Sequence, residues 1–227
     1  KGSAIGSEEG RKVLLDAATK AGITNPTEQA MFLAQMDHKS DGFKTLDENF
    51  NYKAPRLAAV FPRYFRSEAE AQEAINKGPE AVAEKVYGGR MGNTNPGDGY
   101  KFHGRGFIQL TGRSNYESAS KGLGIDLANN PEKAADPETA AQIATWYWKT
   151  RKISEPAARG DVGTVTRLIN GGTNGLADRE AKFRQYTGLV QSGQLGGDTA
   201  NSGIKTALTG GNIDGKVPTL VGEREPE

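Results

Sequence analysis

The sequence contains no cysteine, which excludes disulfides and thiolate metal sites as sources of stability or chemistry. Its two histidines, His38 and His103, are too few for a protein-only zinc site without carboxylate help. No apolar run is long enough to cross a bilayer, and the N-terminal stretch KGSAIGSEEG lacks the apolar core of a signal peptide. We therefore expect no metal, no cofactor and no membrane insertion.

The chain also lacks a large net charge, because its 227 residues include 29 Lys and Arg and 28 Asp and Glu. A formal net charge of +1 gives no global field and no basic stripe, which argues against a nucleic-acid partner. The length suits one large core. After Gln191 the composition shifts to Gly, Ser, Thr and Asn, so we expect a domain over residues 1–191 and a flexible Gly-rich tail or linker over 192–227, in a monomer.

Most of residues 1–191 carries apolar residues at helical spacing, often after a capping residue or a first-turn proline. The pattern predicts a mostly α fold. The helices expected are Ser7–Ala21, one from Asn25 to about Lys39, three short ones between Ala54 and Tyr87, Asp136–Lys149, Asp161–Asn170 and Ala177–Val190.

Two further stretches are ambiguous. The glycine-dense segment from Gly88 to Gly106 reads as a long loop of functional importance, in which Asp98 would by default be a solvent-facing turn residue. Trp146, Tyr147 and Trp148 resemble a sugar platform, but three consecutive aromatic residues cannot share one helix face. At least one of them therefore belongs to the core.

The stretch from Met31 to Tyr52 is the chemically richest, since a helix there runs into a polar segment. Enzymes that hydrolyse carbohydrates usually need two acidic residues, and Glu48 is the carboxylate we favour. Three other residues, one in this stretch and two further along the chain, each have two possible interpretations. His38 is either a hydrogen-bonded strut or catalytic, Arg105 either a structural ion pair or the partner of a carboxylate in the cleft, and Asn170 either a helix cap or a sugar ligand.

Three ordered blocks resemble glycoside hydrolase family 19, the chitinases and phage endolysins. HKSDGF followed by LDENFNY is similar to that family's H-E-S/T-x-G-F and E-N-x-N-Y segments, and GRGFIQLTGRSNY is similar to its G-R-G-x-I-Q block. LINGGTNGLADREAKFRQY resembles its I-N-G-G-x-x-G stretch and the arginine that follows. The resemblance covers roughly residues 25 to 190.

This resemblance implies a lysozyme-like α-helical domain with a central substrate cleft that cleaves a β-1,4 link between N-acetylated sugars by inversion. Glu48 would be the general base, with Thr111 and Gln109 placing the attacking water, and the general acid falls on Lys39. The other residues expected to contact the substrate are Gln109, Asn170, Tyr52, Asn115, Arg105, Arg179 and His38.

Lys39 is the departure from the family pattern. An ammonium with a reference pKa of about 10.4 is a poor proton donor near neutrality, so we expect an impaired hydrolase. The competing hypothesis is a cell-wall glycan-binding or structural module that does not cut. Likeness to endolysins in MFLAQ and RMGNTNPGDG favours peptidoglycan strands over chitin oligosaccharides as partner, and the bacterial cell wall as the place of action. The end VPTLVGEREPE resembles a short element of phage tail proteins, which favours a place in a larger phage tail protein.

Overall fold

The computed structural model describes residues 6–195, and its secondary structure is almost entirely helical, which confirms the expected mostly α fold. The predicted tail lies outside the described residues from position 196 onward. The elements are α1 (Ser7–Lys20), α2 (Pro26–Lys39), α3 (Ala54–Val60), α4 (Glu68–Lys77), α5 (Pro79–Tyr87), α6 (Asp98–Lys101), α7 (Arg113–Leu123), the 3-10 helix η1 (Pro131–Ala135), α8 (Pro137–Thr150), α9 (Ser154–Ala158), α10 (Val162–Asn170) and α11 (Leu176–Gln191).

Local side-chain chemistry explains where three of these helices begin. The side chains of Asn25, Asp136 and Asp161 accept hydrogen bonds from backbone N–H groups in the first turns of α2, α8 and α10, at 3.0, 3.2 and 3.0 Å. These N–H groups have no partner inside the helix, and a capping oxygen satisfies one of them. Proline occupies the first helical position of both α2 and α8, where its missing N–H costs nothing.

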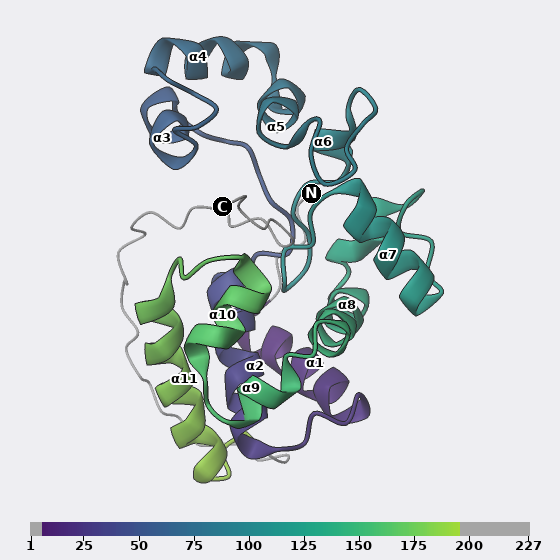
Figure 1. Cartoon of the computed structure of the whole chain (residues 1–227), viewed down its shortest axis with the longest axis vertical. Helices are drawn as coiled ribbons and strands as arrows, with labels where there is room; N and C mark the ends of the chain where they lie inside the picture. The colour runs from purple at the N-terminus through teal and green to yellow at the C-terminus, as the bar shows by residue number, and fades with distance from the viewer. Residues whose placement is uncertain (1–5, 196–227) are drawn as a thin grey trace.

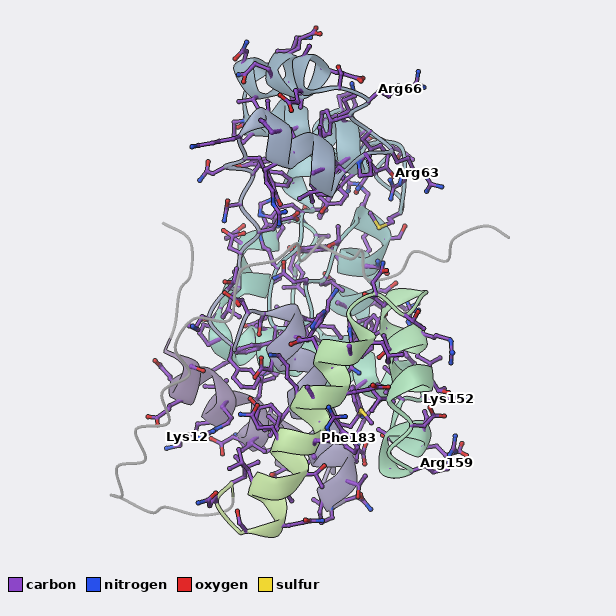
Figure 2. All side chains as sticks on the ribbon, turned by 90° about the vertical axis from the view of Figure 1, so that its left-hand side faces the viewer. Lys12, Arg63, Arg66, Lys152, Arg159 and Phe183 are labelled. Carbon is purple, nitrogen blue, oxygen red and sulfur yellow. The ribbon has the colours of Figure 1, made fainter. Side chains whose placement is uncertain are left out.

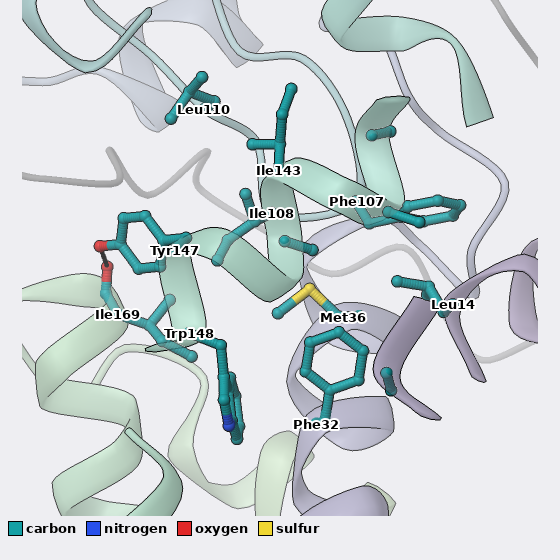
Figure 3. Close-up of a cluster of buried hydrophobic side chains, with 14 of the residues drawn as sticks. Leu14, Phe32, Met36, Phe107, Ile108, Leu110, Ile143, Tyr147, Trp148 and Ile169 are labelled. Carbon is teal, nitrogen blue, oxygen red and sulfur yellow. Dashed lines mark hydrogen bonds between the residues drawn. The ribbon is translucent and has the colours of Figure 1, made fainter. Parts of the chain in front are cut away.

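The larger of two hydrophobic clusters joins α1, α2, α7, α8, α10 and α11 (Figures 1 and 3). Helix α2 packs against α11, and α1 against α8. The Phe32 and Trp148 rings meet edge to face at 5.1 Å, and Tyr147 Oη donates to the carbonyl of Ile169 at 3.4 Å. Tyr147 and Trp148 are therefore core residues, while Trp146 is partly exposed and its indole lies against Gly122.

A second, smaller cluster is formed by α3, α4 and α5 with Phe50, Phe61 and Phe65 (Figure 1). The chain enters this part after Leu46 and leaves it before Arg105, so the two crossing segments link the two clusters. They are held to each other by backbone hydrogen bonds from Glu48 N to Gly104 O at 2.9 Å and from Gly106 N to Leu46 O at 2.7 Å. The fold thereby brings the Glu48 segment and the GRGFIQLTG segment together.

GRGFIQLTG forms turns that lead into α7, whose N-cap is Gly112. Arg105 makes isolated antiparallel bridges to Asp47 and Leu110, and Gln109 has a left-handed backbone conformation with φ of 59°. A left-handed non-glycine residue is uncommon and is found where the surrounding structure requires it. Here it turns the chain so that Gln109 and Thr111 come to lie beside Glu48.

The expectation for Asp98 was wrong. Its side chain is only 2% exposed and accepts two hydrogen bonds from Arg113, from Nε at 2.8 Å and from Nη2 at 2.7 Å. Its other partner is the backbone N–H of Asn95 at 3.0 Å. This bidentate pair holds the predicted loop, which contains α6, against α7. The residue is buried because tertiary packing brings Arg113 to it, which the turn chemistry of the loop could not indicate.

Exposed basic side chains are spread over the molecule. Lys12 on α1, Arg63 and Arg66 between α3 and α4, and Lys152 and Arg159 around α9 project outward from separate regions (Figure 2). None of the helices in residues 6–195 combines the length and the apolar character that a bilayer-spanning segment needs.

Candidate active site

Glu48 is anchored at the junction of the two crossing segments. Tyr87 Oη at the end of α5 donates to its Oε1 at 2.7 Å, and the backbone N–H of Gly104 donates to its Oε2 at 2.9 Å. Since Glu48 N also donates to Gly104 O, both the backbone and the side chain of Glu48 are held by one residue. A carboxylate with two donors has a defined orientation, which a general base requires.

Gly104 marks the point where the predicted water-positioning residues converge on Glu48. A Cβ added to Gly104 would lie 2.8 Å from Gln109 Oε1, 3.1 Å from Glu48 Oε2 and 3.3 Å from Thr111 Oγ1. A side chain here would press on these three oxygens, most strongly on Gln109 Oε1, so glycine suits the close approach. The structure thus brings Glu48, Gln109 and Thr111 together, as their order in the sequence predicted.

The buried His103 pairs with Asp47, the half-buried neighbour of Glu48 in the chain. His103 Nε2 meets Asp47 Oδ1 at 2.6 Å, and His103 Nδ1 lies 2.5 Å from the carbonyl of Tyr100. Burial raises the pKa of Asp47, but the hydrogen bond and charge of His103, with the charge of Arg105, outweigh it and hold the pKa below its usual value. Neither His103 nor Asp47 was among the predicted site residues.

Arg105 belongs to this support, and its guanidinium is engaged by protein groups. Its Nε lies 3.5 Å from Asp47 Oδ1, and its Nη1 donates to the carbonyl of Lys101 at 2.8 Å and to Tyr116 Oη at 3.1 Å. The side chain is buried, and all of these partners are protein atoms. The ion-pair interpretation therefore describes Arg105, and its predicted contact with the substrate finds no support in this geometry.

Lys39 is the last residue of α2 and comes close enough to Glu48 and Arg179 for their charges to shift its titration. Burial first, and then the charge of Arg179, lower the pKa of Lys39 to about 7, against the opposing attraction of Glu48. Burial likewise raises the pKa of Glu48, while the Tyr87 hydrogen bond, the Gly104 N–H and the charges of His103 and Lys39 act in the other direction. Both groups are thus displaced toward their neutral forms.

Three other predicted residues lie on α2, α10 and α11. Arg179 is 0% exposed and donates through Nη1 to Gln35 Oε1, one turn before Lys39. His38 Nδ1 meets Asp178 Oδ2 at 2.6 Å, which agrees with the strut interpretation. Asn170 is the last residue of α10, but Gly171, in the left-handed conformation, takes the C-cap position, so the cap interpretation of Asn170 was wrong.

Tyr52 and Asn115 complete the predicted set. Tyr52 packs edge to face on Phe61 at 6.0 Å and borders a pocket of about 370 Å³ with Lys53, Ile75 and Pro79. Burial, with the charge of Glu48, raises the pKa of Tyr52 to about 12, so its ring is near the candidate base. Asn115 Nδ2 donates to the carbonyl of Thr111 at 2.7 Å and so helps to fix Thr111.

Within residues 6–195, no three His, Asp or Glu side chains are grouped so that they could hold a metal ion. A larger pocket, of about 610 Å³, lies on α1 and α8, where Trp146 lines it with Val13, Ala17 and Lys149. None of the predicted catalytic residues borders it.

Comparison with known proteins identifies the fold. The profile of glycoside hydrolase family 19, described as "Chitinase class I", matches residues 15–205. The chain belongs to glycoside hydrolase family 19. A family 19 domain-containing protein of Haemophilus influenzae is 42% identical over 168 residues, which are 73% of this chain and 81% of the relative. Chitinase 11 of Oryza sativa is 27% identical over 222 residues, covering 77% and 85% of the two chains.

Solved structures agree with the family 19 assignment. A bacterial family 19 chitinase superposes with a TM-score of 0.53 at 25% identity, covering 83% of this chain and 89% of that one. Chitinase C of Streptomyces griseus gives a TM-score of 0.50 at 25% identity, with coverage of 79% and 69%. The helical fold that positions Glu48 and Lys39 is therefore that of family 19.

Sequence reasoning missed Tyr87 and the His103–Asp47 pair. Tyr87 is 39 positions from Glu48 and His103 is 56 positions from Asp47, so nothing in local spacing connects them. One signal was available for His103, since it directly precedes the Gly-Arg-Gly block. The polar Asp47, adjacent to Glu48, was its natural partner.

The lowered pKa of Lys39 predicts how stability depends on pH. In the unfolded chain Lys39 titrates near 10.5, and in the folded chain near 7, so between these values only the unfolded state binds this proton. The free energy of unfolding should therefore gain up to about 1.4 kcal/mol per pH unit from Lys39 as the pH rises from 7.5 to 9. Denaturant unfolding of Lys39→Met should lack this gain, whereas Lys12→Met, on the exposed face of α1, should keep it. Equal slopes in both variants would contradict the lowered pKa of Lys39.

Proposed function

We propose that this chain is a peptidoglycan-degrading glycosidase of the muramidase type whose cleavage step is impaired by Lys39. The observation that carries the proposal is the convergence of Glu48 Oε2, Gln109 Oε1 and Thr111 Oγ1 around Gly104. A carboxylate and two further oxygens in this arrangement can hold a water molecule and remove its proton. Lys39, near enough to act on the charge of Glu48, takes the place where the family pattern puts the proton donor.

The mechanism follows from these residues. Glu48 accepts a proton from water as the water attacks the anomeric carbon, and the leaving oxygen needs a proton from the opposite side of the sugar. Burial makes Lys39 a stronger acid than an exposed lysine, but a cationic donor beside Arg179 opposes the positive charge that develops on the sugar. Binding and water activation are thus retained, while protonation of the leaving group is weak.

Peptidoglycan is favoured as the substrate for two reasons. The H. influenzae relative, from a bacterium, is more similar to this chain than the rice chitinase is. Arg179, together with Lys39 when it is protonated, also suits a glycan that carries acid groups. The protein would then act on the bacterial cell wall, either as a free enzyme or as part of a larger phage tail protein. Chitin is the alternative, supported by the relatives named as chitinases.

The second candidate function is a wall-binding module that does not cut, and Lys39 is the observation in its favour. The test uses Lys39→Glu on purified sacculi and on chitohexaose. Muropeptides that end in reduced muramic acid after borohydride treatment are expected from sacculi, faster than any cleavage of chitohexaose. Cleavage of chitohexaose alone would reassign the substrate to chitin. Retention on sacculi with no new reducing ends in Lys39→Glu would favour the binding module.

A further inference from the structure

A pocket on α1 and α8 lies apart from the residues around Glu48. Its volume is about 610 Å³, and it lies where α1 packs against α8, with the end of α7 beside them (Figure 1). On α8, its lining residues Gln142, Thr145, Trp146 and Lys149 recur at the spacing of one helix face. Pockets of about 300 to 1,000 Å³ commonly hold small ligands, so this pocket is large enough for one.

Trp146 forms one wall of this pocket. Its neighbours Tyr147 and Trp148 belong to the core, where Trp148 Nε1 donates to Glu28 Oε1 at 3.0 Å, while Trp146 is partly exposed. A Cβ added to Gly122 on α7 would collide with Trp146 Nε1, so the indole lies directly against this glycine. Glycine lowers the stability of a helix, and here the missing side chain is what admits the ring. The indole is thereby held in place beside the hollow.

The lining combines an apolar base with a polar rim. Val13, Ala17 and Leu123 are partly buried and pack on the hydrophobic core beneath the pocket. At the rim, the side chain of Gln142 is exposed and offers both a donor and an acceptor. Ligand sites in proteins typically have this composition, in which apolar and aromatic groups supply contact area and a few polar groups fix orientation. A matching ligand has an apolar face and a polar edge.

The charged side chains of the lining cancel. Asp16 and Glu138 lie at the pocket together with Lys20 and Lys149, and all four are exposed. Two acids against two bases give the lining no formal net charge, so neither an anion nor a cation gains a net attraction from it. Carboxylates accept hydrogen bonds and ammonium groups donate them, which suits hydroxyl and amide groups because these can do both. The lining therefore favours a neutral ligand rich in hydroxyls.

We propose that the pocket on α1 and α8 is a second glycan-binding site, in which a neutral N-acetylated sugar stacks on Trp146. One face of a pyranose ring carries C–H groups and its edge carries hydroxyls. Contact with the indole would bury the apolar face while the hydroxyls meet the polar rim. The identity of the sugar rests on the proposed function, whereas the preference for a neutral, hydroxyl-rich ligand rests on the pocket.

A protein partner suits this surface less well than a sugar. A second copy of the chain, or an apolar peptide, would cover the exposed charges of Asp16, Lys20, Glu138 and Lys149. Taking charges out of water is costly unless each gains a well-placed opposite charge. A single sugar chain is narrow enough to leave these groups in contact with water, so the cost is avoided.

A second site changes how the chain holds a polymer. An insoluble glycan presents many strands, so the cleft at Glu48 and the pocket at Trp146 can be occupied at the same time. The second contact is then intramolecular and slows release from the polymer, without adding to the affinity of the cleft for a short sugar. Loss of Trp146 should therefore weaken retention on the polymer.

The two tryptophans of the chain make the pocket directly observable. Trp148 is 0% exposed, so Trp146 is the tryptophan that a quencher can reach. Millimolar N-acetylchitotriose is expected to protect the fluorescence of the parent chain from quenching by acrylamide. Trp146→Phe should lose this protection, because the remaining tryptophan lies in the core.

Retention on purified sacculi and on chitin beads tests the site with the polymers themselves. Trp146→Ala should bind both about tenfold more weakly, in line with the loss of one stacked aromatic ring. Gln142→Ala removes an exposed side chain without disturbing the core, and it should weaken retention in the same direction. Phe183→Ala is the matched control, since Phe183 is a partly exposed aromatic residue on α11, outside the pocket (Figure 2). It should be retained like the parent chain.

Three results would overturn the proposal. Fluorescence that N-acetylchitotriose does not protect, or protection that persists in Trp146→Phe, would remove the sugar from this pocket. Retention of both Trp146→Ala and Gln142→Ala at the level of Phe183→Ala would remove its role on the polymer. Sedimentation showing a dimer that Trp146→Ala dissociates would make a second copy the occupant. These measurements involve no cleavage, so they are independent of whether Lys39→Glu cuts sacculi or chitohexaose, which tests the proposed function.

Discussion

Replacing Lys39 by glutamate is expected to raise the rate of glycan cleavage by about a hundred- to ten-thousand-fold, the usual contribution of a positioned general acid. Burial and the charge of Glu48 would both raise the pKa of the new carboxyl, while the charge of Arg179 would act in the other direction. It would also pair with Arg179, whose Nη2 has no partner among the described residues. Release of reducing ends from purified sacculi measures the rate.

Lys39→Gln separates a missing acid from an unwanted cation. Glutamine removes the positive charge near Glu48 without supplying a proton, so this variant should be no faster than the parent chain. If glutamine and glutamate restored cleavage equally, Lys39 would act only through its charge. The pH profile of Lys39→Glu should be bell-shaped, because one carboxyl must be protonated while Glu48 is ionised. Circular dichroism of each variant controls for the fold.

The second large effect is expected at Glu48, and only when an acid is present. In the Lys39→Glu background, Glu48→Gln should reduce cleavage by about a hundred- to ten-thousand-fold, because the base that takes the proton from water is lost. In the parent chain the same substitution should change little, since the reaction is already limited by protonation of the leaving oxygen. Groups that act as a unit are non-additive in this way.

The parent chain, Lys39→Glu, Glu48→Gln and the double variant form a double-mutant cycle that can be compared in one assay. Glutamine is close in size to glutamate, its amide oxygen can accept from the Gly104 N–H and its amide N–H can donate to Tyr87 Oη, so the site should remain packed. Undiminished activity of the double variant would remove Glu48 from the catalytic role and leave its carboxylate as a structural anchor. Asp47→Asn is the matched control, since Asp47 is engaged by His103 and should alter the rate less than Glu48 does.

Local interactions explain why the helices could be predicted closely. The predicted Asp161–Asn170 helix is observed as α10 with Asp161 as its cap, and the predicted Ala177–Val190 helix is observed as α11 from Leu176 to Gln191. Apolar spacing and capping depend on residues a few positions apart, which a single sequence displays directly. The burial of Asp98 was missed for the opposite reason, since its partner Arg113 lies 15 positions away.

The sequence by itself determined the helical class, the order of the three family 19 blocks and the identities of Glu48, Lys39, Gln109 and Thr111. Only the tertiary structure decided what surrounds them. Tyr87, Gly104 and Arg179 reach the site from three different elements, and the shifts in the pKa of Glu48 and Lys39 depend on that packing. The effects of burial and of neighbouring charges on a pKa act over a few ångströms in space. Residues far apart in the chain therefore set the pKa values of Glu48 and Lys39, and spacing along the sequence does not reveal such contacts.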